Sequence, residues 1–250
     1  MERGLLMKHF FRLFSAAVCA ALVLSLCACA AGGASSATVS SAPDSLSAPA
    51  SSSVTSSEPP AAAADDGAQA LSLLPADAEV IQPDAVPDFL TADQQALYRA
   101  AYYLYYHFSM TGGFFPNGYD TATALIGDNG QTFYRDDGFS GYAAFRAAMD
   151  SAFTEDYTNS LLNEYQTYMD DGNDALYSAP GDRGGDILYV RSEFTSVSET
   201  ADEICFQLIG HYDEAGPDSS ASSQPYTEAY DFKLVNTENG WRFASFALAY

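Results

Sequence analysis

Residues 203–212, EICFQLIGHY, are rich in β-branched and aromatic side chains, which is typical of a β-strand. Three further runs of this kind surround it, at 187–198, 226–235 and 241–249. The segments between them, 199–202, 213–223 and 236–240, carry the Gly, Pro, Asn, Asp and Ser residues of turns. The last third of the chain is therefore predicted to form a four-stranded antiparallel meander.

Helical patterns precede these strands. Thr91-Ala92-Asp93-Gln94 has the form of a capping box, and apolar residues recur behind it at helical spacing, which predicts a helix over 91–109 that ends at Gly112 and Gly113. A short strand is expected at 131–135. Ser140 is expected to cap a second helix, and Thr154 a third helix that ends near Gly172. Helices followed by a meander predict an α+β fold, with N-terminal helices packed on a curved four-stranded antiparallel sheet.

The chain before residue 87 has a different composition. No Phe, Tyr or Trp occurs from Ser15 to Asp88, and the stretch from Ala30 to Ala64 is mostly Ser and Ala with scattered Pro. Such a segment buries too little apolar area to offset the entropy lost on ordering. We therefore expect a disordered Ser/Ala/Pro-rich tether over 29–86 and one domain over 87–250.

The first thirty residues have the pattern of a lipoprotein leader. Three basic residues precede an apolar run, and Leu26-Cys27-Ala28-Cys29 follows it as a lipobox. We expect residues 1–28 to be a signal peptide and Cys29 to carry lipid, which places the protein extracellularly, on the outer face of the cytoplasmic membrane. The alternative is an ordinary cleaved signal peptide followed by a coincidental cysteine.

The charge limits the partners. The chain carries 10 Lys and Arg against 33 Asp and Glu, a net charge of −23 that becomes about −25 once residues 1–28 are removed. Because such a chain repels phosphate backbones, nucleic acid is excluded as a partner, and a protein partner should be neutral or basic. After processing only Cys29 and Cys205 remain, so no internal disulfide is expected, and Cys205 is interpreted as a small buried residue.

Several short motifs resemble known families. The final hairpin, Tyr230 to Ala244, is similar to that of cystatin-like or nuclear-transport-factor-2-like domains. Phe133-Tyr134-Arg135, Phe153-Thr154-Glu155-Asp156-Tyr157 and Gly181-Asp182-Arg183-Gly184-Gly185 resemble the IseA family of secreted inhibitors of cell-wall D,L-endopeptidases. The resemblance implies a cystatin-like domain that blocks a peptidase cleft with an acidic surface. It implies no particular inhibitory residue.

Two acidic segments are the candidate partner-binding sites. The run Asp170-Asp171-Gly172-Asn173-Asp174 has part of a calcium-loop pattern but lacks the closing Glu, so we interpret it as a solvated helix end or an acidic lip that meets a basic groove. No metal is therefore expected. The Gly-rich stretch 181–186 is interpreted as a tight turn in which Arg183 pairs with a carboxylate. The residues assigned to partner binding are Asp170, Asp171, Asp174, Asp213, Glu214 and Asp218.

The sequence contains few of the residue patterns that are typical of catalytic sites. It contains no Ser/His/Asp motif, zinc spacing or nucleotide fingerprint, which favours a binding protein without a cofactor over an enzyme. The predicted first helix is aromatic nearly all round, so it either fills the core or lines a cone between helix and sheet. His107 on that helix is either structural or a base in the cone. The tyrosines concerned are Tyr98, Tyr102, Tyr103, Tyr105 and Tyr106.

The function expected is inhibition or docking of a cell-wall peptidoglycan hydrolase by a monomeric, membrane-anchored domain. Two alternatives stay open. The first is a small-molecule-binding or proton-transfer domain that uses the cone, and the second is a structural envelope lipoprotein without a discrete ligand.

The lipobox generates the first testable prediction. Replacing Cys29 with Ala removes the acylated thiol, so the Cys29→Ala protein should be released into the medium, whereas the natural protein should enter the detergent phase on phase separation. A Cys29→Ala protein that still partitions with membranes would contradict the lipid anchor.

Overall fold

The computed structural model describes residues 65–79, 81–181, 183–213 and 224–249. They form four α-helices and two four-stranded antiparallel sheets, which confirms the predicted α+β class. Cys29 lies outside the described residues. The helices are α2 (Asp66–Ser72), α3 (Ala92–Tyr106), α4 (Tyr142–Ala152) and α5 (Glu155–Tyr165).

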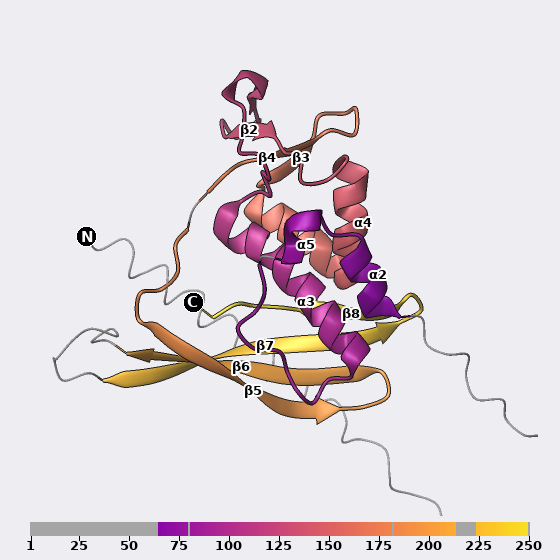
Figure 1. Cartoon of the computed structure of the whole chain (residues 1–250), viewed down its shortest axis with the longest axis vertical. Helices are drawn as coiled ribbons and strands as arrows, with labels where there is room; N and C mark the ends of the chain where they lie inside the picture. Colours follow the sequence, from indigo (N-terminus) through magenta and orange to yellow (C-terminus); the bar gives the residue numbers. More distant parts are fainter. Residues whose placement is uncertain (1–64, 80, 182, 214–223, 250) are drawn as a thin grey trace, which may run out of the picture. The chain divides into compact units, whose positions relative to one another are not determined.

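The C-terminal sheet is the predicted meander. Its strands pair in sequence order, each antiparallel to the next, and the sheet is strongly curled with the helices on one face (Figure 1). Burial alternates along the second strand, so that Ile204, Phe206 and Leu208 face the helices. The strands are β5 (Tyr189–Glu199), β6 (Glu203–Asp213), β7 (Pro225–Thr237) and β8 (Gly240–Ser245).

The first strand of this sheet, β5, lies at its edge and is irregular. Its register against β6 shifts between Tyr189 and Arg191 and again between Ser196 and Ser198. The residues at these two bulges are Val190 and Val197, and both are exposed. A bulge bends the strand and interrupts its ladder of hydrogen bonds.

Helix α3 supplies the centre of the core. The predicted capping box is present, because Thr91 and Gln94 exchange side-chain to backbone hydrogen bonds of 3.0 and 3.3 Å. Tyr98 packs on the curled sheet with its ring 5.4–6.2 Å from four phenylalanine rings, and such pairs each add about 0.5–1.5 kcal/mol beyond the area they bury. These partners are Phe194, Phe232, Phe243 and Phe246.

The helix ends as predicted at Gly112. After α3 the chain forms one π-helical turn over His107–Thr111, and Gly112 closes it with φ 70°. A Cβ at this position would clash with the carbonyl oxygen of Ala179. Only glycine combines the left-handed conformation with this close approach.

Order begins earlier than the composition predicts. Residues 65–86 fall within the predicted tether, yet they contain α2 and a 3-10 turn at Ala76–Glu79. Small residues explain the difference: Gly67 lets α2 approach α3 so closely that its N–H donates to Asp93 at 2.7 Å, and Ala70 is fully buried. The rest of the predicted tether, 29–64, lies outside the described residues.

Buried Asp66 joins this N-terminal helix to the last hairpin. Its Oδ2 accepts a 3.0 Å hydrogen bond from the backbone N–H of Trp241, and its Oδ1 lies 3.8 Å from Nη1 of Arg242. A buried carboxylate is stable when such donors satisfy it. The first described helix is therefore part of the domain.

The structure also contains a second, smaller sheet. Only one of its strands was predicted, at 131–135, and it corresponds to β2. The prediction that the third helix reaches Gly172 is wrong, because α5 ends at Tyr165 and Gln166 adopts a left-handed conformation with φ 50°. The next residues form a strand, since the ring of Tyr168 is buried against Phe145 and Phe108. The strand order is β1 (Leu125–Ile126), β2 (Thr132–Arg135), β4 (Leu176–Ser178), β3 (Tyr168–Asp170).

Cys205 is less buried than expected. Its side chain is half-buried on the sheet face away from the helices, where the thiol contacts Oε1 of Glu203 at 3.3 Å. Burial and this carboxylate raise the pKa of the thiol, which opposes thiolate chemistry. Among the described helices, none is long and apolar enough to span a bilayer.

The position of Asp66 generates a stability prediction. Asp66→Ala leaves the Trp241 N–H without its charged acceptor and should lower the free energy of unfolding by about 2 kcal/mol, or Tm by about 4–8 °C. Asp88→Ala, at an exposed site, is the matched control and should change Tm little. Equal melting of the two variants, measured by circular dichroism, would show that α2 is not held as described.

Candidate functional site

The residues assigned to partner binding do not form one site. Asp170, Asp171 and Asp174 belong to the β3–β4 hairpin, whereas Asp213 ends β6 in the other sheet (Figure 1). Glu214 and Asp218 lie outside the described residues. The two acidic candidate segments therefore belong to different sheets.

The β3–β4 turn uses its carboxylates to fold itself. Oδ1 of Asp170 accepts backbone N–H bonds from Gly172 and Asp174, and Oδ1 of Asp171 accepts them from Asn173 and Ala175, all at 2.8–3.1 Å. These backbone donors lower the pKa of Asp171 in the folded protein. The ionised carboxylate therefore stabilises the fold at a pH above the pKa that Asp171 has in the unfolded chain. This stabilisation is lost as the pH falls through the lower pKa of the folded state. Within the described residues, no group of three or more His, Cys, Asp or Glu side chains is placed to hold a metal ion.

Asp174 caps helix α4 across the fold. Its backbone oxygen accepts the N–H of Tyr142 at 3.0 Å, and its Oδ1 accepts the N–H of Ala143 at 2.6 Å. The prediction that Ser140 caps this helix is wrong, because the N-cap is Gly141 and the capping carboxylate comes from a distant hairpin. Asp174 therefore has a structural role that the sequence pattern does not reveal.

The small sheet displays exposed apolar side chains. Tyr119 is 51% exposed and Ile126 70% exposed, and the ring of Tyr119 lies 5.5 Å from that of Phe115 and 4.7 Å from that of Tyr134. We call this surface the tip. It is formed by four apolar side chains and three exposed carboxylates: Phe115, Tyr119, Ile126 and Tyr134, with Asp120, Asp128 and Asp137. The aromatic rings contact one another, and Ile126 lies on β1, the strand that pairs with the Tyr134 strand β2, which makes this surface a candidate contact surface.

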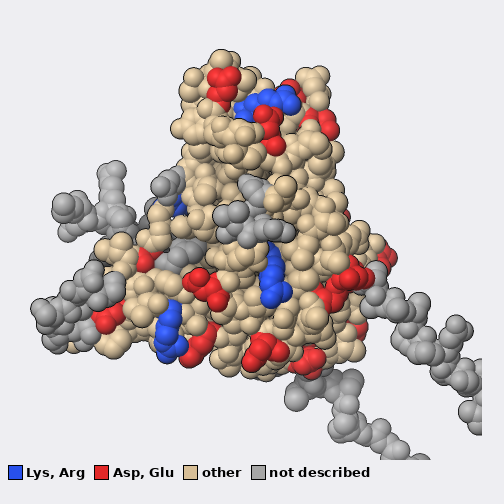
Figure 2. Space-filling model, in the orientation of Figure 1, with Lys and Arg blue, Asp and Glu red and all other residues tan. Residues whose placement is uncertain are grey.

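Carboxylates frame the apolar part of the tip. Among the residues described there, Arg135 forms an ion pair with Asp137 at 3.0 Å, and the hydrogen bond and charge of Asp137 are the main cause that raises the pKa of its guanidinium. Figure 2 shows acidic side chains on both sides of a basic patch at the end of the fold that holds β2–β4. The tip is therefore an acidic surface with an apolar centre.

Buried Asp136 fixes the tip to the rest of the domain. Its Oδ2 accepts the N–H of Phe114 at 2.8 Å and the hydroxyl of Ser178 at 2.7 Å, while its Oδ1 accepts the N–H groups of Phe115 and Gly138 at 3.0 and 2.9 Å. Four donors compensate the burial of this carboxylate. This side chain thus links the loop before β1 to β4, next to the end of β2.

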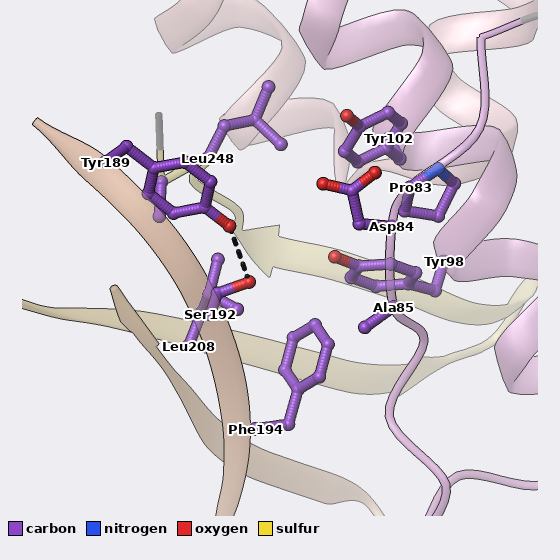
Figure 3. A pocket seen from close by; sticks show the side chains of 11 residues that line it. Pro83, Asp84, Ala85, Tyr98, Tyr102, Tyr189, Ser192, Phe194, Leu208 and Leu248 are labelled. Carbon is purple, nitrogen blue, oxygen red and sulfur yellow. Dashed lines mark hydrogen bonds between the residues drawn. The ribbon is translucent and has the colours of Figure 1, made fainter. Parts of the chain in front are cut away.

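The space between α3 and the curled sheet is mostly filled. A cavity of about 40 Å³ remains at its margin, far smaller than the several hundred Å³ of a usual substrate pocket (Figure 3). Its walls come from α3, from β5 and β6, from the segment before α3 and from the chain end. The lining residues are Pro83, Asp84, Ala85, Tyr98, Tyr102, Tyr189, Ser192, Phe194, Leu208, Leu248 and Ala249.

Polar atoms point into this cavity. The hydroxyl of Tyr98 faces it, although the residue is only 2% exposed, and burial raises the pKa of that hydroxyl so that it stays neutral. The hydroxyl of Tyr189 donates to Ser192 at 3.0 Å, and exposed Asp84 also lines the cavity. The i, i+4 spacing of Tyr98 and Tyr102 is a sequence signal for this wall, but Asp84 was missed because its segment was assigned to the tether.

His107 takes no part in this cavity. It is buried, and its Nδ1 lies 2.9 Å from both Oγ1 of Thr111 and the carbonyl oxygen of Gly113. Its ring packs 4.7 Å from Tyr103 and 4.5 Å from Phe114. These contacts favour the structural interpretation of His107 over a role as a base.

Comparison with known proteins adds no relative. No known family model matches the chain, and a search of curated proteins finds no match. The tip and the cavity are therefore the structural features that bear on function.

The capping role of Asp174 generates a prediction. Asp174→Ala should lower the free energy of unfolding by about 1 kcal/mol, the usual value of an N-cap, in urea denaturation. Asp137→Ala removes an exposed ion pair and should change it by less than about 0.5 kcal/mol. A larger loss in Asp137→Ala than in Asp174→Ala would contradict this assignment.

Proposed function

We propose that this protein is a membrane-anchored extracytoplasmic binding protein that docks on a cell-wall D,L-endopeptidase and inhibits it. The observation that carries the proposal is the tip, where Tyr119 and Ile126 are exposed within a frame of carboxylates. The Asp136 anchor supports it, because a preorganised surface loses little entropy when it binds.

The proposed mechanism is steric occlusion of the cleft. Aromatic and aliphatic anchors at the centre of an interface usually supply most of the affinity, which assigns that role to Tyr119 and Ile126. The surrounding carboxylates act on a basic cleft at longer range, so they mainly raise the association rate and fix orientation. Asp170 and Asp171 belong to this acidic frame in the proposal.

The proposed cellular location and family follow from the sequence. A net charge of −23 suits a neutral or basic partner, and the Cys29 lipid would hold the domain at the outer face of the membrane beside the cell wall. The curled meander packed on α3 supports a cystatin-like domain and the resemblance to the IseA family. The β1–β4 sheet would then be the part that carries the inhibitory surface.

The filled interior supports binding over proton transfer. A space of about 40 Å³ encloses only a small chemical group, so a cone-based enzyme has little room for a substrate. A structural lipoprotein without a ligand would show neither activity.

The tip generates the binding prediction. We expect the full-length Cys29→Ala protein to bind and slow a secreted D,L-endopeptidase within a panel of peptidoglycan hydrolases, measured by surface plasmon resonance and by turnover. Tyr119→Ala/Ile126→Ala should weaken this binding about 30-fold or more through faster dissociation, because central anchors cost about 2 kcal/mol or more when truncated. Raising the salt concentration should slow association about tenfold.

The matched control is Val190→Ala/Val197→Ala, which removes equally exposed apolar side chains from β5 in the other sheet. This variant should bind as the parent does. Absence of binding to every hydrolase in the panel would refute the inhibitor function. Equal weakening in both double variants would leave the function and remove the tip as its site.

A further inference from the structure

Asparagine followed by glycine occurs three times in the chain, and two of these pairs adjoin the tip. A glycine has no Cβ to shield its backbone nitrogen, so the side-chain amide of a preceding asparagine can react with that nitrogen. All three pairs share this chemistry, and their surroundings decide which of them reacts. The pairs are Asn117-Gly118 directly before Tyr119, Asn129-Gly130 in the β1–β2 turn, and Asn239-Gly240 in the β7–β8 turn.

The reaction is an intramolecular acyl transfer that releases ammonia. The deprotonated glycine nitrogen attacks Cγ of the asparagine, so that an N–Cγ bond forms, the Cγ–Nδ2 bond breaks, and the amide nitrogen leaves with the proton as ammonia. Water then opens the cyclic succinimide at either carbonyl, which gives aspartate or isoaspartate. Water is the only co-reactant, and this chemistry makes asparagine a thermolabile residue.

Asn117 is the least restrained of the three asparagines. It is exposed, and among the described residues no hydrogen bond holds its side chain. Gly118 adopts φ 74°, and a Cβ built there would meet no atom within 4 Å beyond its chain neighbours. Its N–H donates to the carbonyl oxygen of Phe115 at 2.9 Å, so the turn must open before the nitrogen can react. Opening an exposed turn displaces no packed side chain.

Asn129 has a similar backbone but a restrained side chain. Gly130 adopts φ 78° in open space, and its N–H donates to the carbonyl oxygen of Gly127 at 2.9 Å. Oδ1 of Asn129 accepts the N–H of Gln131 at 2.9 Å, and its Nδ2 donates to Oε1 of Gln131 at 3.2 Å. These two bonds oppose the side-chain rotation that the attack requires, so Asn129 should react more slowly than Asn117.

Packing opposes the reaction at Asn239. Gly240 begins β8 with φ 93°, and a Cβ at this position would clash with the carboxylate of buried Asp66. Oγ1 of Thr237 donates to the carbonyl oxygen of Gly240 at 2.7 Å and accepts the N–H of Asn239 at 3.2 Å. The nearby carboxylate also disfavours the anionic nitrogen that the attack needs. This pair should be the least reactive.

We propose that Asn117 is a site of spontaneous deamidation, and that in the folded protein it converts to aspartate and isoaspartate ahead of Asn129 and Asn239. Either product adds a carboxylate beside the tip. Isoaspartate also routes the main chain through its Cβ, which lengthens the chain between Phe115 and Tyr119, whose rings lie 5.5 Å apart. The reaction depends on this turn alone, so it does not require the tip to bind a hydrolase.

The test is incubation of the full-length Cys29→Ala protein in warm buffer of mildly alkaline pH, followed by peptide mapping. Mass spectrometry with fragmentation assigns the conversion to each asparagine, and enzymatic methylation detects isoaspartate. Asn117 should convert about tenfold faster than Asn129, whose two side-chain hydrogen bonds must first break, and faster still than Asn239. In concentrated urea the three asparagines should convert at similar rates, because unfolding removes the differences between their surroundings.

Asn117→Gln is the matched variant, because glutamine keeps the amide but has to close a larger ring. It should abolish the fast conversion and leave Asn129 and Asn239 unchanged. Conversion of Asn129 or Asn239 in the folded protein as fast as that of Asn117, an Asn117 that reacts only in urea, or a fast conversion that persists in Asn117→Gln would overturn the proposal.

Discussion

The packing of α3 into the curled sheet is the contact on which the rest of this structure depends. With no disulfide among its described residues, the domain is held by aromatic contacts in which the ring of Tyr98 meets Phe194, Phe232, Phe243 and Phe246. Rings of this size fill the interior and leave about 40 Å³ at its margin. The same packing thus closes a substrate-sized cone and creates the small polar cavity beside Tyr98.

Two buried carboxylates extend this core to distant parts of the chain. Asp66 attaches the first described helix to the last hairpin, and Asp136 attaches the loop before β1 to β4, next to the end of β2. Each carboxylate accepts hydrogen bonds from backbone N–H groups, which makes its burial affordable. Short elements are in this way fixed on α3 and the curled sheet.

The sequence predicted the helices and strands that are long enough to show a hydrophobic period. The meander and α3 with its capping box follow from runs of nine or more residues, whereas β1, β3 and β4 are only two to three residues long and carry no readable period. Helix α2 was missed because small Gly67 and Ala70, and not large apolar residues, allow it to pack. Of the candidate sites, the tip and the cavity depend on loop residues such as Tyr119 and Asp84, whose neighbours are set by tertiary structure.

The two bulges of β5 affect how copies of the protein interact with one another. An open strand edge invites pairing with the edge of another copy, and regular strands of this length are a known route to aggregation. A lipid-anchored protein, as proposed, meets its own copies at high effective concentration in the plane of the membrane. By breaking the hydrogen-bond ladder near both ends of β5, the bulges at Val190 and Val197 oppose edge-to-edge growth where crowding is greatest.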